Sequence, residues 1–125
     1  SQVISETSAG TNKYRISQVY RFTTVANLNL ILRVEGNRGN SNDLFFEFKY
    51  AAPANGVWPT PTNKQGWTAT GLNITKTADD DQFQSTSLGS SASTVRCIRI
   101  QDEKRTNDGQ LDTLTLDKLY LFPAP

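Results

Sequence analysis

The chain has 125 residues, with 13 basic and 12 acidic side chains and a net charge of +1. A chain of this length forms one domain with a single core, and so small a net charge produces no field that would attract nucleic acid or an anionic membrane. No apolar run reaches the roughly 18 residues that a membrane span requires. The sequence contains no histidine, which removes the commonest general base and any nucleophile that a histidine activates.

Residues 1–13 are polar apart from the pair Val3 and Ile4. We expect them to form an N-terminal arm, either loose or lying on a partner, ahead of a β-sandwich domain over residues 14–125. Only 36% of the chain is hydrophobic, a content that suits short strands with polar outer faces and many loops.

Apolar and polar side chains alternate in several segments, which is the period of a half-buried strand. Strands are expected over residues 14–24, 27–34, 43–50, 67–75, 82–88, 95–100 and 111–122. The clearest is the second, whose inward side chains are Leu28, Leu30, Leu32 and Val34. Residues 35–42 and the Pro-rich residues 51–66 are expected to be loops, because turn-forming residues dominate them.

Seven or eight short strands at spacings near ten residues, without a convincing helix, predict an all-β fold. We expect a single antiparallel β-sandwich of the jelly-roll type. In the last strand, Leu114 and Leu116 share one face, but the apolar positions resume at Leu119. This odd step predicts a β-bulge near Asp117. The single cysteine, Cys97, lies in an apolar strand and is expected to be a small buried hydrophobe.

Carboxylates gather in the expected loops and at strand ends: Asp79, Asp80, Asp81, Asp102, Asp108, Asp112 and Asp117. Oxygen ligands of this kind suit calcium, and Asp102, Asp112 and Asp117 are the candidate ligands of a structural calcium ion. No stretch has the spacing of an EF-hand loop. The alternative is that no cofactor is bound and that these carboxylates cap turns or pair with nearby lysine and arginine side chains.

Aromatic side chains are the other candidates for a site. Trp58 in the Pro-rich segment, Trp67 at a strand start and Tyr50 at a strand end could stack on the apolar face of a sugar ring. The alternatives are packing within the core or beneath a loop, and anchoring a protein interface. No pair of carboxylates stands out for glycoside hydrolysis. We therefore expect that the protein is not an enzyme.

A resemblance to a known module rests on residues 43–50, 74–84, 95–106 and 111–121 together with Trp58. Over roughly residues 14–121 the chain resembles a jelly-roll-like β-sandwich module of large secreted or surface proteins of bacteria and archaea. It is also broadly similar to carbohydrate-binding modules. No ligand-binding motif of such a module matches residue by residue, so the resemblance implies a fold and an extracellular setting but transfers no site.

Two functions remain open. The first is a non-catalytic assembly protein at a virion or cell surface, such as a decoration (cement) protein of a phage capsid or a subunit of a surface filament. Its partners would be proteins, including copies of itself, and its polar arm could add a strand to a neighbour's sheet. The second is a carbohydrate-binding module of an extracellular enzyme or adhesin, with a polysaccharide as partner. Neither involves nucleic acid or insertion into a membrane.

Overall fold

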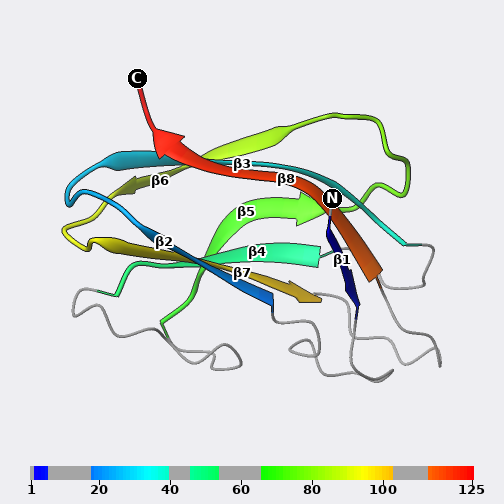
Figure 1. The fold of residues 1–125 in the computed structure, drawn as a ribbon, viewed down its shortest axis with the longest axis horizontal. Helices are drawn as coiled ribbons and strands as arrows, with labels where there is room; N and C mark the ends of the chain where they lie inside the picture. The colour runs from blue at the N-terminus through cyan, green and yellow to red at the C-terminus, as the bar shows by residue number, and fades with distance from the viewer. Residues whose placement is uncertain (1, 6–17, 40–45, 54–65, 103–112) are drawn as a thin grey trace.

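The computed structural model describes residues 2–5, 18–39, 46–53, 66–102 and 113–125, and these residues form eight strands without a helix (Figure 1). The strands are β1 (Gln2–Ser5), β2 (Gln18–Thr23), β3 (Asn29–Arg38), β4 (Phe46–Ala51), β5 (Thr68–Ile74), β6 (Gln84–Ser90), β7 (Val95–Asp102) and β8 (Thr113–Pro123). Within these ranges there is accordingly no helix of the length and hydrophobicity needed to cross a membrane.

The strands form two four-stranded antiparallel sheets that lie over one another (Figure 1). The first sheet has the order β1-β8-β3-β6 and the second has the order β2-β7-β4-β5. The hydrogen-bonded pairs β1–β8, β2–β7, β3–β6 and β4–β5 each join a strand of the first half of the chain to its counterpart in the second half. One long antiparallel ribbon rolled into two layers produces this order, which is the jelly-roll connectivity. The predicted antiparallel sandwich of jelly-roll type is therefore confirmed.

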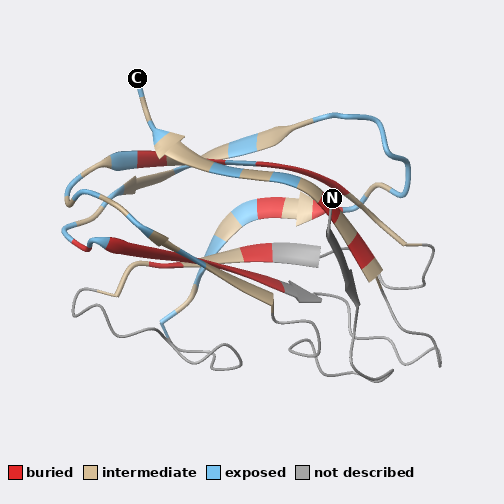
Figure 2. Ribbon diagram, viewed as in Figure 1, coloured by how far each residue is buried: buried red, intermediate tan, exposed pale blue. Residues whose placement is uncertain are grey.

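The core lies between the two sheets (Figure 2). Its buried side chains are Leu32, Val34, Phe48, Leu72, Ile74, Ile98, Ile100, Leu114 and Leu116. The alternation predicted for β3 is confirmed, because Leu30, Leu32 and Val34 are buried while Arg33 is exposed. Each large aliphatic side chain removed from water in this way contributes about 1.5–3 kcal/mol to folding.

The bulge expected near Asp117 is present. Along the β3–β8 ladder, Glu35 pairs with Lys118 and the next pair is Gly36 with Leu116, so Asp117 has no partner in register. β3 and β8 approach each other closely beside the bulge: a Cβ added to Gly36 would lie only 2.5 Å from the Thr115 carbonyl oxygen. A bulge re-aims the side chains around it, and the carboxylate of Asp117 consequently belongs to the site described below.

Two boundaries differ from the predictions. The arm expected over residues 1–13 contains β1, which pairs antiparallel with β8, so these four residues belong to the sandwich. They supply the backbone partners that one side of β8 would otherwise lack. Residues 6–17 lie outside the described residues. The loop expected over residues 35–42 is wrong for residues 35–38, because β3 continues to Arg38 and pairs with β8 along that extension. Residues 40–42 lie outside the described residues.

Candidate functional site

Glu35 is a buried carboxylate on the outer face of the first sheet. Side chains alternate along β3, so Glu35 points away from the face on which Val34 meets the core. It is nevertheless only 1% exposed, and neither Oε1 nor Oε2 accepts a hydrogen bond from a donor in the described part of the chain. Buried carboxylates in proteins are normally paired or hydrogen-bonded, because their removal from water is expensive.

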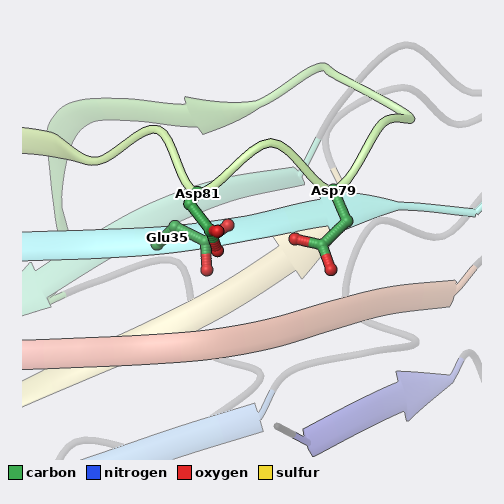
Figure 3. Close-up of side chains that lie close together, drawn as sticks. All are labelled: Glu35, Asp79 and Asp81. Carbon is green, nitrogen blue, oxygen red and sulfur yellow. The ribbon is translucent and has the colours of Figure 1, made fainter.

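The connection between β5 and β6, residues 75–83, brings two further carboxylates to Glu35. One carboxylate oxygen from each of Glu35, Asp79 and Asp81 lies within 4.8 Å of the other two. Figure 3 shows Glu35 on β3 and the two aspartates on the connection, with the three carboxylates facing the same space. Asp81 has a left-handed backbone, with φ of 57°, a conformation that aspartate tolerates better than most residues.

Asp117, at the bulge of β8, is the fourth member of this carboxylate cluster, which we define as Glu35, Asp79, Asp81 and Asp117. Burial raises the pKa of Glu35 above its ordinary value, and the neighbouring carboxylates of Asp117 and Asp79 raise it further. The charge of Asp117 is also the largest cause that raises the pKa of Asp79. Ionised carboxylates only accept hydrogen bonds, so groups this close need a shared proton or a cation between them.

Lys76 lies at the edge of the carboxylate cluster. Its Nζ is 4.0 Å from Glu35 Oε1, the limit for an ion pair. The same ammonium donates hydrogen bonds to the carboxylate of Asp80 and, at 3.1 Å, to the carbonyl oxygen of Gln82. Its hydrogen bond is the main cause that lowers the pKa of Asp80. Lys76 is therefore engaged chiefly with Asp80 and neutralises the charge of the cluster only in part.

The three predicted calcium ligands are placed differently by the structure. Asp117 joins the carboxylate cluster. Asp102 is the last residue of β7, which belongs to the second sheet, and Asp112 lies outside the described residues. Glu35 is absent from the site residues predicted from the sequence, because turn-forming residues in its segment predict a loop. A strand pattern continued through residue 35 would have placed Glu35 outward, but nothing local indicates what covers it.

The described contacts of two predicted ligand-binding aromatics are internal. The hydroxyl of Tyr50 accepts a hydrogen bond from Arg96 Nη1 at 2.9 Å, and its ring packs against the core. Trp67 packs against a small buried cluster, and the guanidinium carbon of Arg99 lies 4.7 Å from the centre of its ring. Trp58 lies outside the described residues. Sugar binding by these three residues stays a prediction.

A different aromatic side chain is exposed on the outer face of the first sheet. Tyr120 lies between Leu119 and Leu121, which pack against the core, and it is 47% exposed. Its ring stacks with that of Phe83 at a centroid distance of 6.2 Å. The Arg33 guanidinium lies 4.0 Å, and the Lys118 ammonium 5.3 Å, from the Phe83 ring centre. We call Arg33, Phe83, Lys118 and Tyr120 the Tyr120 surface.

Comparisons with known proteins give no family or relative for this chain. A scan against protein families gave no match, and neither the curated proteins nor the solved structures gave a significant one. What the carboxylate cluster and the Tyr120 surface bind therefore follows from the chemistry of their own residues.

Proposed function

We propose that this protein is a non-catalytic interaction module that assembles with protein partners through the Tyr120 surface. The observation that carries the proposal is the exposure of Tyr120 beside Arg33 on a sheet face. Tyrosine and arginine are enriched among the residues that dominate binding energy in protein interfaces. Decoration of a phage capsid, or a subunit role in a surface filament, is the setting that we propose, at the surface of a virion or a cell.

Two further points support a role without catalysis. The whole sequence contains no histidine, and acid–base or nucleophilic chemistry near neutral pH most often depends on one. Glu35, one of the two carboxylates whose pKa is raised, is 1% exposed beneath the β5–β6 connection, so no substrate reaches that carboxylate without movement of the connection.

Sedimentation velocity of the purified chain over a range of concentrations tests self-assembly. We expect the wild-type protein to associate as concentration rises and Tyr120→Ala to remain monomeric under the same conditions. Val25→Ala is the matched control, because Val25 is 72% exposed but lies in the turn between β2 and β3. A wild-type protein that is monomeric throughout, or association that survives Tyr120→Ala, would contradict self-assembly through this surface.

Carbohydrate binding is the second candidate function, and the same exposed ring favours it. The exposed ring of Tyr120 suits stacking on a sugar ring. Arg33, its partner in the β3–β8 ladder, and Lys118, which with Arg33 lies over the neighbouring Phe83 ring, supply hydrogen-bond donors for sugar hydroxyl groups. The resemblance to carbohydrate-binding modules supports this alternative. Affinity electrophoresis through a panel of polysaccharides separates the two functions.

Retardation by one polymer that is lost in Tyr120→Ala and kept in Val25→Ala would favour the carbohydrate-binding alternative. The same gel with Trp58→Ala tests the ligand residue predicted from sequence. If no polymer retards the wild-type chain, assembly with protein partners remains the proposal.

A further inference from the structure

We propose that Glu35, Asp79 and Asp81, with Asp117 beside them, bind a calcium ion that holds the β5–β6 connection against the first sheet. The carboxylates come from three separate parts of the chain: β3, the connection and the bulge of β8. The proposal does not depend on what the Tyr120 surface binds.

The burial of Glu35 is the observation that points to a bound cation. An exposed acidic cluster is common on protein surfaces, but Glu35 is 1% exposed and neither of its oxygens has a hydrogen-bond donor among the residues that the structure describes. Removing an ionised carboxylate from water without a partner is so unfavourable that the group is normally neutralised or bound to a cation. The three neighbouring carboxylates raise the free energy of the ionised Glu35 further, because like charges repel.

Lys76 does not fully neutralise the negative charge of the carboxylate cluster. Its single positive charge is 4.0 Å from Glu35 and is hydrogen-bonded to Asp80 and Gln82. Among the residues that the structure describes, the cluster's ion-pair partner is therefore one ammonium, which is already hydrogen-bonded elsewhere. A divalent cation supplies twice that charge at a much shorter distance from the oxygens.

The geometry and chemistry of the ligands select calcium. All the ligand atoms are carboxylate oxygens, which hard cations prefer, whereas zinc and copper sites use histidine or cysteine. Calcium–oxygen distances of about 2.3–2.6 Å place oxygens on opposite sides of the ion about 4.6–5.2 Å apart. The oxygens of Glu35, Asp79 and Asp81 lie within 4.8 Å of one another. Magnesium needs a smaller, near-ideal octahedron and usually keeps several waters, whereas calcium accepts a larger and less regular set of protein carboxylates.

Bound calcium would also position the Tyr120 surface. Phe83, which stacks with Tyr120, belongs to the same connection as Asp79 and Asp81. A cation that ties these aspartates to Glu35 therefore restrains the aromatic pair as well. The site acts as a structural clamp in the fold, with no chemical step.

Thermal unfolding of the purified chain in chelator, calcium or magnesium tests the proposal. We expect Tm to rise by about 5–10 °C when calcium is present at 100 times its Kd. Isothermal titration calorimetry with calcium chloride should give one site per chain. No calcium-dependent rise in Tm and no heat of binding would overturn the proposal, and a rise produced by magnesium alone would overturn the assignment to calcium.

Glu35→Gln and Asp80→Asn locate the site. Glu35→Gln keeps the shape of the side chain and removes its charge, so calcium affinity should fall at least about tenfold. In the presence of chelator, Glu35→Gln should be more stable than the wild type, because it buries no unpaired charge. Asp80→Asn is the matched control, because Asp80 lies in the same connection but is held by Lys76; it should keep the calcium response. If Glu35→Gln does not fold, Asp79→Asn replaces it. Calcium affinity equal to that of the wild type in Glu35→Gln, or in Asp79→Asn where it replaces Glu35→Gln, would overturn the proposed site.

Discussion

Arg96 on β7 donates a hydrogen bond from Nη1 to the hydroxyl of Tyr50 on β4, at 2.9 Å. The Arg96 side chain is fully buried, and its Nη2 donates to the carbonyl oxygens of Leu28 at 3.1 Å and Ser91 at 3.4 Å. One guanidinium thus connects two strands of the second sheet with the segments that precede β3 and follow β6. A charged side chain inside an apolar strand acts here as part of the fold.

Removal of the Tyr50 hydroxyl tests this connection. Tyr50→Phe leaves one buried guanidinium hydrogen unpaired, so we expect the free energy of unfolding to fall by about 1–3 kcal/mol. Arg96→Met removes every one of these bonds and should cost more than Tyr50→Phe. Urea denaturation followed by tryptophan fluorescence measures both. A Tyr50→Phe protein as stable as the wild type would show that this hydrogen bond adds nothing to the fold.

The close approach of β3 and β8 at Gly36 predicts a steric cost for a methyl group. Gly36→Ala would place Cβ 2.5 Å from the Thr115 carbonyl oxygen, so the bulge beside Asp117 must shift. We expect the free energy of unfolding to fall by at least about 2 kcal/mol. Gly71→Ala is the comparison, because its Cβ meets open space but its φ is +83°; it should cost about 1–2 kcal/mol from backbone strain alone. Equal stability of Gly36→Ala and wild type would contradict the close approach.

The proposed calcium clamp predicts a change in proteolysis at Lys76. This residue lies in the β5–β6 connection and is a trypsin site by its charge. With calcium bound the connection is held against β3, so cleavage after Lys76 should be slow; chelator should accelerate it several-fold. Mass spectrometry of the fragments identifies the bond. In Glu35→Gln the rate should be the same with calcium and with chelator, and a calcium effect retained there would count against the clamp.

The buried thiol of Cys97 predicts low reactivity. Cys97 is fully buried, and burial raises the pKa of its thiol. Because the folded pKa exceeds the unfolded one, the contribution to stability is complete below the ordinary thiol pKa of about 8.5 and is lost as pH rises through the folded pKa. Labelling with a disulfide reagent at pH 8 should be far slower in buffer than in denaturant. Equal rates would mean that the thiol reaches solvent in the native protein.

Local patterns explain most of what was predicted correctly. The alternation in β3 and the odd step between Leu116 and Leu119 report side-chain direction along one strand, and that direction is a local property. The loop predicted from residue 35 onward is wrong over residues 35–38, because the conformation there depends on contacts with a distant strand. Gly36 and Asn37 favour turns by propensity, but the ladder with β8, a strand nearly 80 residues away in sequence, holds them extended.

The sequence by itself determined the all-β class, a succession of short strands that allows a jelly roll, the bulge at Asp117 and the burial of Cys97. Tertiary structure alone decided which carboxylates meet. Glu35, Asp79 and Asp117 belong to three distant segments, and they come together because the β3–β8 register aligns two of them while the β5–β6 connection crosses the outer face of that sheet with the third. Periodicity predicts which way a side chain points, whereas burial depends on what the rest of the chain lays over it.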